Sequence, residues 1–247
     1  MRKTSIEWTD WTWNPVTGCL SRCPYCYNLR PGSLLSRFGA IYIENGKTCT
    51  ETLTWRRRKT GEIHIARKGE RIPYGYDPTF YPHRLEEPVK RRTPSKIFVC
   101  DCGDLWGEWV PKKWIEEVLK VVKMCPQHTF QLLTKNPRRY VDFGLPNNTW
   151  AGTTVTSNED YGRAIIMKKV KVPVRFLSIE PLLGEVSFNL HGIQWIIIGA
   201  QTGKNPVKPR KEWIEKVISN ARKLKIPIFL KNNLRSCYPF SLQQFPV

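Results

Sequence analysis

The feature that most limits the fold of this chain is a repeat that begins at residue 96. Short apolar runs alternate with turns and amphipathic segments from there to residue 230. This alternation indicates parallel strands joined by helices. The expected strands are residues 96–100, 129–133, 149–155, 174–179, 195–199 and 226–230. The expected helices are residues 111–124, 137–142, 158–170 and 210–224. With one more strand in residues 11–18, about seven strands fit the α/β class and a partial or nearly closed TIM-like (β/α) barrel.

A segment near the N-terminus departs from this repeat. Residues 40–46 end in Asn45 and Gly46, a pair typical of a hairpin turn, and β-type alternation continues in residues 48–55 and 62–66. We expect a single domain over residues 1–247, with a small basic β-rich insertion at about residues 40–95.

The composition limits the class of protein. A chain of 247 residues is ample for one barrel and short for two full domains. It has no apolar run of the roughly 18 residues that a membrane span needs, and residues 1–8 lack the apolar core of a secretion signal. We therefore expect a cytoplasmic protein without membrane contact, in which the eight cysteines bind metal or stay reduced.

Three of these cysteines lie close together. Cys19, Cys23 and Cys26 have C-x3-C-x2-C spacing, with Tyr25 directly before the last. Three thiolates on one short loop can hold three corners of a [4Fe–4S] cluster, and no fourth cysteine follows at comparable spacing, which leaves one iron open. A zinc site is the alternative. Its fourth ligand would be Cys49, Cys100, Cys102 or His64.

The triplet resembles the signature of the radical S-adenosylmethionine (SAM) superfamily. Further blocks resemble the phage-associated three-cysteine-motif branch of that superfamily, and together they cover most of the chain except about residues 30–80. These blocks are residues 5–10, 13–19, 132–135, 176–183 and 228–231. The resemblance implies a [4Fe–4S] cluster on Cys19, Cys23 and Cys26 whose open iron binds the amino and carboxyl groups of SAM. It also implies cleavage of SAM to methionine and a 5′-deoxyadenosyl radical, with an electron donor such as flavodoxin or ferredoxin.

The polar residues directly after the strands are the expected site residues, because chemistry in such barrels lies at the carboxyl ends of the strands. Asp101 and Asp104 follow the second strand, where the superfamily receives the SAM amino group, although its Gly-Gly-Glu letters are absent. Asp104 is equally a candidate for a helix cap. The resemblance places Tyr25 near the SAM adenine. Lys135, after the third strand, is a candidate for the SAM carboxylate or a substrate phosphate.

Further candidates follow the fourth and fifth strands. Thr154, Thr156 and Asn158 carry hydroxyl and amide groups that suit the SAM ribose, and Asn158 is equally a candidate cap of the next helix. Glu180 ends an otherwise apolar strand, where a carboxylate needs a partner. We expect Glu180 to bind SAM or to contact the substrate.

The remaining candidates follow the sixth, seventh and second strands. Gly199 lies where the superfamily packs on adenine, but this chain has Gly-Ala-Gln-Thr-Gly where relatives often have Gly-Gly-Glu-Ser-Gly. Lys231 would point into the mouth or bind phosphate. Cys102 follows the second strand, where a thiol could donate a hydrogen atom to a substrate radical, as in lesion-reversing members of the superfamily. The alternative is an inert buried thiol.

The charge indicates a polyanionic partner. The net charge is +19, because 40 Lys and Arg residues outnumber 21 Asp and Glu residues. Neutralising phosphates releases condensed counterions, so DNA or RNA is the simplest partner; solvated lysines that only aid solubility are the alternative. The residues expected to contact it are Trp55, Arg56, Arg57, Arg58, Lys59, Lys90, Arg91 and Arg92.

The leading prediction is therefore a radical SAM enzyme that modifies a base or sugar, or repairs a lesion, in DNA or RNA. One alternative is a radical SAM enzyme that acts on a peptide or a small metabolite. Another is a non-catalytic metal-containing protein that binds nucleic acid.

Overall fold

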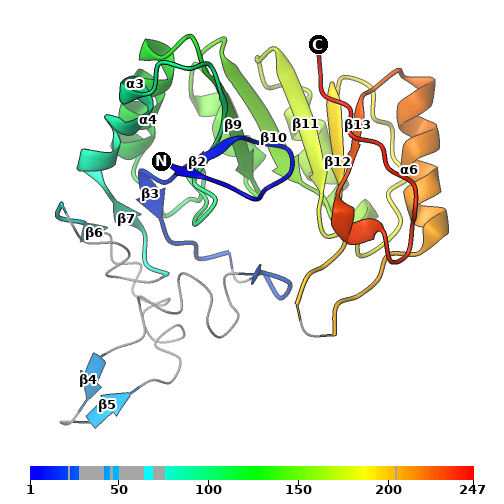
Figure 1. The fold of residues 1–247 in the computed structure, drawn as a ribbon, viewed down its shortest axis with the longest axis horizontal. Helices are drawn as coiled ribbons and strands as arrows, with labels where there is room; N and C mark the ends of the chain where they lie inside the picture. The colour runs from blue at the N-terminus through cyan, green and yellow to red at the C-terminus, as the bar shows by residue number, and fades with distance from the viewer. Residues whose placement is uncertain (22, 28–41, 45–46, 50–63, 69–75, 204) are drawn as a thin grey trace. The chain divides into compact units, whose positions relative to one another are not determined.

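The structure is a computed structural model (Figure 1). It describes residues 1–21, 23–27, 42–44, 47–49, 64–68, 76–203 and 205–247. The chain divides into two compact units, one formed by Met1–Ser5 with Thr9–Thr129 and the other by Ile6–Trp8 with Phe130–Val247.

The first unit holds three neighbouring strands of the main sheet. β1 (Arg2–Lys3) pairs antiparallel with β2 (Trp11–Trp13), and β2 pairs parallel with β8 (Lys96–Val99). A smaller sheet joins β3 (Val16–Thr17), β7 (Thr79–Phe80) and β6 (His64–Ile65). β3 ends directly before the segment that carries the three cysteines, and its pairing with β7 holds the start of that segment in place.

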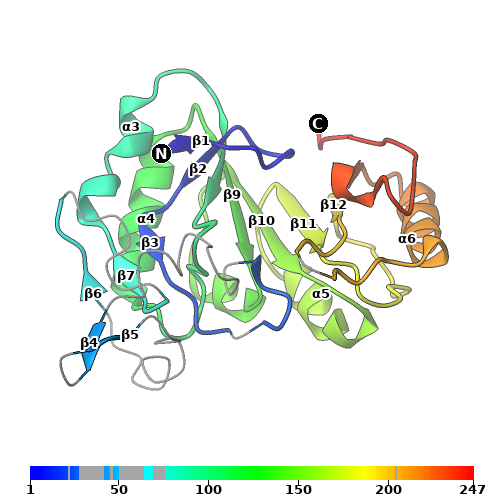
Figure 2. The ribbon, with the colours of Figure 1, turned by 60° about the horizontal axis from the view of Figure 1, so that its bottom comes forward.

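The helices of the first unit lie before and after β8. α4 (Lys112–Met124) buries Ile115, Val118 and Val122 on one face, as expected for apolar residues three and four positions apart. α3 (Glu87–Lys90) lies beside α4 in Figures 1 and 2 and follows the 3-10 turn η2 (Pro82–Arg84).

The insertion contains the hairpin expected at Asn45 and Gly46. β4 (Tyr42–Glu44) pairs antiparallel with β5 (Lys47–Cys49), which confirms that part of the prediction. Residues 40–41, 45–46, 50–63 and 69–75 of the insertion lie outside the described residues, so the turn residues Asn45 and Gly46 themselves are not described.

The second unit contains the strands of the repeat in chain order. From β9 to β13, each strand pairs parallel with the next. The strands are β9 (Thr129–Thr134), β10 (Thr149–Thr154), β11 (Val174–Ile179), β12 (Trp195–Ile198) and β13 (Ile228–Leu230). All four residues of β12 are buried, which explains the continuous apolar run. The first and last residues of these five strands differ from the predicted ones by two residues or fewer, so the predicted strand positions are confirmed.

The connections of the second unit are less regular than expected. Residues 137–142 form a 3-10 helix, η3 (Pro137–Asp142), and α5 (Tyr161–Met167) is preceded by η4 (Asn158–Asp160). α6 (Lys211–Lys223) buries Ile214, Val217, Ile218 and Ala221. The short η5 (Asn232–Leu234) follows β13.

The prediction of a partial or nearly closed TIM-like barrel is wrong. The main sheet is open and mixed, with the strand order β1-β2-β8-β9-β10-β11-β12-β13, and no pairing between β1 and β13 is seen in the described residues. Both edges are blocked locally. β1 covers β2 in antiparallel pairing, and the C-terminal segment covers β13 through bonds from Leu230 N–H to the Leu242 carbonyl (2.6 Å) and from Gln244 N–H to the Ile228 carbonyl (2.9 Å). The backbone groups that barrel closure needs are therefore already paired.

Across the described ranges, every helix is too short or too polar to span a bilayer.

Candidate functional site

Gly18 fixes the start of the cysteine loop, which we define as residues 18–27. Its N–H donates to the carbonyl oxygen of Cys102 at 3.0 Å, and the N–H of Cys19 donates to the carbonyl oxygen of Tyr76 at 3.0 Å. Two backbone bonds to distant segments therefore set the direction in which the loop leaves β3.

Only glycine fits at this position. Gly18 has a φ of +89°, and a Cβ there would lie 2.2 Å from the carbonyl oxygen of Asp77. Gly103 also packs closely on Gly18, because a Cβ at residue 103 would lie 2.8 Å from the Gly18 carbonyl oxygen. The start of the loop thus sits in a backbone slot with no room for a side chain.

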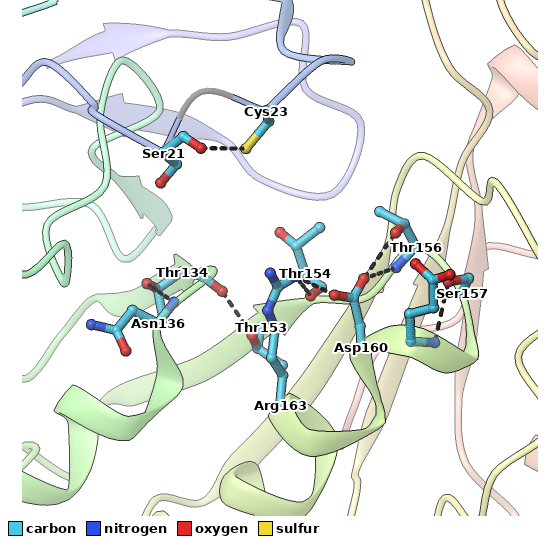
Figure 3. A network of polar contacts seen from close by, with 11 residues as sticks. Ser21, Cys23, Thr134, Asn136, Thr153, Thr154, Thr156, Ser157, Asp160 and Arg163 are labelled. Atoms are coloured by element: carbon cyan, nitrogen blue, oxygen red, sulfur yellow. Dashed lines mark hydrogen bonds and ion pairs between the residues drawn. The ribbon is translucent and has the colours of Figure 1, made fainter. Parts of the chain in front are cut away.

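The three loop cysteines are half-buried thiols rather than disulfides. The N–H of Cys26 donates to the carbonyl of Cys23 at 3.0 Å, so one tight turn holds both residues. Figure 3 shows the Cys23 thiol directed at the carbonyl oxygen of Ser21, 4.0 Å away. Three partly accessible thiols have the chemistry of iron–sulfur ligands. Among the described residues, no three His, Cys, Asp or Glu side chains are gathered as metal ligands, so a cluster would draw these thiols together.

The end of the loop is tied to the segment after β8. The Tyr27 hydroxyl donates to the backbone carbonyl of Asp101. Tyr25 lies inside the loop and is half-buried, and its predicted contact with adenine stays a prediction. Sequence reasoning missed Tyr27, although its place one residue after the triplet was a usable signal.

Asn14 organises the two residues after β8 that were expected to be functional. Its amide nitrogen donates to Asp101 Oδ1, and its amide oxygen accepts the Cys102 N–H at 3.0 Å. Cys100, just before them, has a φ of +61°, which is strained for a residue other than glycine. Asp101 and Cys102 are therefore brought to the cysteine loop. Asn14 was missed, although it lies in the Trp-Asn-Pro block before the triplet.

Burial controls the protonation of these groups. It raises the pKa of the Asp101 carboxyl, and the hydrogen bond from Asn14 acts in the opposite direction. It also raises the pKa of the Cys102 thiol, with the neighbouring Asp101 charge acting the same way. Cys102 is 5% exposed and keeps its S–H bond at neutral pH, the form that a hydrogen-atom donor needs.

Alkylation should separate the two groups of cysteines. In the native apoprotein, iodoacetamide is expected to label Cys19, Cys23 and Cys26 well before Cys100 and Cys102, because the latter are buried and burial raises their pKa, which lowers the thiolate fraction. Peptide mapping by mass spectrometry against time measures this. Urea-unfolded protein is the control, in which all five should react alike; equal rates in the native protein would contradict the assigned burial.

Asp104 has a structural role in the turn after β8. It is 6% exposed, and its Oδ1 accepts the Trp106 N–H at 3.0 Å. The alternative prediction, that Asp104 caps the next helix, is wrong. The next helix is α4, and its N-cap is Pro111.

In the second unit, three strand ends bring together Glu180, Gly199 and Lys231, each predicted from the sequence as a site residue. Lys231 Nζ donates to Glu180 Oε1, in an ion pair whose side chains are only 17% and 23% exposed. A Cβ at Gly199 would lie 3.0 Å from Glu180 Cδ and 3.1 Å from Lys231 Cδ. Glycine at residue 199 therefore leaves the space that the pair occupies.

Asn233 supports this group and was missed from the sequence. Its amide nitrogen donates to the Ala200 carbonyl at 2.8 Å, and its amide oxygen accepts the Ala200 N–H at 3.1 Å. The bond from the Lys231 N–H to the Ile198 carbonyl, 2.9 Å, holds the same two strand ends together. The Lys-Asn-Asn run after β13 was the available signal.

A double-mutant cycle should show that the Glu180–Lys231 pair is coupled. Glu180→Gln and Lys231→Met are expected to give a coupling of about 1–2 kcal/mol in the free energy of unfolding, because each charge is held largely out of water. The control cycle is Glu86→Gln with Lys90→Met, an ion pair at 2.6 Å whose side chains are 68% and 73% exposed. It should show no measurable coupling; urea unfolding that gives equal couplings would contradict the assignment.

Two of the three residues expected to contact ribose, Thr154 and Thr156, belong to a network around Asp160 (Figure 3). The N–H and hydroxyl of Thr156 donate to Asp160 Oδ2 at 2.7 and 2.8 Å, and Arg163 pairs with Asp160 Oδ1 at 2.8 Å. Arg163 also donates to the carbonyl of Thr154, whose side chain is buried. Asp160 was missed, although an acid four residues after a threonine at a helix start was a usable signal.

Asn158 is placed differently from Thr154 and Thr156. Its amide bonds Ser187, accepting the backbone N–H at 2.9 Å and donating to Oγ at 3.0 Å. The alternative prediction that Asn158 caps the following helix is wrong, because Ser157 Oγ accepts the Glu159 N–H at 3.2 Å as the cap.

The remaining predicted residues are Lys135 and the basic residues expected to contact nucleic acid. Lys135 follows β9 and is half-buried. Trp55, Arg56, Arg57, Arg58 and Lys59 lie outside the described residues. Lys90 ends α3, and Arg91 and Arg92 follow it directly.

Comparisons with known proteins give a family without an activity. No curated protein and no solved structure matches the chain. A family model described as "Protein of unknown function (DUF5131)" matches residues 3–235, a span that includes the cysteine loop and the Glu180–Lys231 pair. The chain therefore belongs to the DUF5131 family of proteins of unknown function.

Proposed function

We propose that this protein is a radical SAM enzyme that holds a [4Fe–4S] cluster on Cys19, Cys23 and Cys26. The observation that carries the proposal is the fixed cysteine loop. Three thiols lie on a segment whose start is bonded to Cys102 and Tyr76 and whose end is bonded to Asp101. A loop held at both ends, with partly accessible thiols between, suits a cluster that exchanges electrons with a donor such as flavodoxin or ferredoxin.

The residues beside the loop have roles that follow from their surroundings. When bound, the cluster and SAM supply a 5′-deoxyadenosyl radical that removes a hydrogen atom from the substrate. Asp101, held by Asn14, would receive the SAM amino group. Cys102, kept as a neutral thiol by burial, would return a hydrogen atom to the substrate radical only after a movement that exposes it. The thiyl radical left on its sulfur would then take up one electron from the donor and one proton from water to restore the thiol.

In the second unit, we propose that Glu180 and Lys231 contact SAM or substrate as a pair. Each satisfies the other, so a ligand carboxylate or phosphate would compete with Glu180 for Lys231. We propose that the SAM ribose is contacted by Thr154, Thr156 and Asn158. Gly199 would pack on the adenine, and Lys135 would bind the SAM carboxylate or a substrate phosphate. Thr156 is the most constrained of these, because its hydroxyl already donates to Asp160.

We propose a nucleic acid as the substrate and the cytoplasm as the place of action. The net charge of +19 supports a polyanionic substrate. The seven cysteines whose side chains the structure describes are thiols, which supports a reducing compartment.

Product analysis tests the chemistry. The protein is reconstituted with iron and sulfide without oxygen, reduced, and given SAM with a DNA or RNA oligonucleotide. 5′-Deoxyadenosine is expected by liquid chromatography and mass spectrometry with wild type and not with Cys23→Ala. A correctly formed [4Fe–4S] cluster without 5′-deoxyadenosine would contradict the proposal and favour a non-catalytic binding protein.

A further inference from the structure

A hollow in the first unit lies at the start of β2, apart from the cysteine loop. It has a volume of about 490 Å³, and its lining includes Trp11, Glu87, Lys90, Arg91 and Arg92. We call it the Trp11 hollow. Figure 2 shows β1, the start of β2 and α3 around this region.

Arg91 and Trp11 form the fixed wall of the hollow. The Arg91 guanidinium lies over the Trp11 ring, 4.2 Å from its centroid, and Arg91 Nε donates to Ser95 Oγ at 2.8 Å. The Arg91 carbonyl is also held, 2.9 Å from His128 Nε2. The side chain is therefore positioned before any ligand arrives, with Nη nitrogens that have no partner among the described residues. This lowers the entropy lost on binding.

The charges around the hollow are predominantly positive. Glu87 is paired with the amino group of Met1, so its charge is compensated. Lys90 is paired with Glu86, but both side chains are more than two-thirds exposed, so the pair is weak and exchangeable. Arg92 is exposed.

β1 adds a further cation. Lys3 lies opposite Trp11 in the antiparallel pair of β1 and β2, and directly opposite residues have their side chains on the same face of a sheet. Lys3 therefore lies on the face that carries the Trp11 ring, and it is exposed there.

We propose that the Trp11 hollow binds the phosphate backbone of a single-stranded nucleic acid. Arg91 and Arg92 contact adjacent phosphates, while Lys3 and Lys90 add positive potential. The guanidinium of Arg91, stiffened by Trp11, also offers a planar surface on which an unpaired base can stack, as bases do on arginine in single-stranded complexes. The proposal rests on the nucleic-acid substrate proposed above and adds the place and the strandedness of the contact.

The test is binding of a fluorescein-labelled single-stranded oligothymidylate to the full-length apoprotein, followed by anisotropy over a range of salt concentrations. Replacing both Arg91 and Arg92 by alanine is expected to weaken binding at least tenfold. It should also reduce the slope of log K against log salt by about 1.4, since each single-strand phosphate contact contributes about 0.7. The matched control is Arg222→Ala with Lys223→Ala at the exposed end of α6, which removes the same charge and should leave the slope unchanged.

Two further arms keep the test decisive. Arg92→Glu alone changes an exposed side chain, so it should fold normally and still weaken binding. Equal losses in the control variant, equal binding of a duplex of the same length, or equally effective displacement by polyglutamate would each overturn the proposal. Because the assay uses apoprotein without SAM, failure of the radical chemistry would not affect its outcome, and failure here would leave SAM cleavage intact.

Discussion

The Gly18→Ala variant is expected to lose at least about 2 kcal/mol of the free energy of unfolding. Two effects add at this residue. The φ of +89° is costly for any residue with a Cβ, and the new methyl group would lie 2.2 Å from the Asp77 carbonyl oxygen and 2.8 Å from that of Tyr76. Both neighbours are backbone atoms, so the strain can be relieved only by moving β3 or the segment before β7. Urea unfolding measures the loss.

Two other glycines separate these effects. Gly192 has a φ of +86°, but a Cβ there would have Lys168 Cγ as its nearest neighbour at 3.6 Å, so Gly192→Ala should cost about 1 kcal/mol from backbone strain alone. Gly162 is in α5 with open space around its Cβ position, so Gly162→Ala should be neutral or stabilising by up to about 1 kcal/mol. The order of losses should be Gly18, then Gly192, then Gly162. Equal losses at Gly18 and Gly192 would mean that the contact with Asp77 is not fixed.

Alanine at any one of Cys19, Cys23 or Cys26 should abolish cluster assembly. Two remaining thiolates leave two cluster corners without protein ligands, and the nearby Cys102 thiol is buried and protonated, so it is not available as a third thiolate. Iron and sulfide content after anaerobic reconstitution, with the visible absorbance of the cluster, measures assembly. Each variant is expected to fall to the level of protein that has not been reconstituted.

The matched control is Cys237→Ala. This thiol lies after β13, is half-buried like the loop cysteines, and donates to the Leu234 carbonyl at 3.2 Å. It should bind as much iron and sulfide as wild type. Full iron content in Cys23→Ala, or an equal loss in Cys237→Ala, would falsify the ligand assignment, and one tightly bound zinc per chain in the purified protein would favour the alternative metal.

The local sequence pattern predicted the strands, but it did not predict that the sheet stays open. An apolar run such as the one in β12 is visible in the sequence because all of its residues are buried. The pairing of Leu230 with Leu242 and of Lys3 with Trp11 decides the sheet edges, and neither segment has a periodicity that sets it apart from a loop. The open sheet therefore could not be deduced from a count of strands.

The sequence was informative about the candidate site where a residue type by itself required an interaction partner. Glu180 at the end of an apolar strand required a partner, and Lys231, 51 positions later, provides it. Positioning residues such as Asn14, Asn233 and Asp160 were not predicted. Their roles depend on which backbone groups the fold brings beside them: Asn14 meets Cys102, which is 88 positions away.

The most direct test of the central claim is the electron paramagnetic resonance spectrum of the reconstituted, reduced wild-type protein, recorded before and after SAM is added. A cluster held by Cys19, Cys23 and Cys26 alone keeps one iron available to SAM. The expected result is the signal of a reduced [4Fe–4S] cluster whose g values shift when SAM binds. The absence of a cluster signal in reconstituted protein, or a signal that SAM leaves unchanged, would contradict the claim.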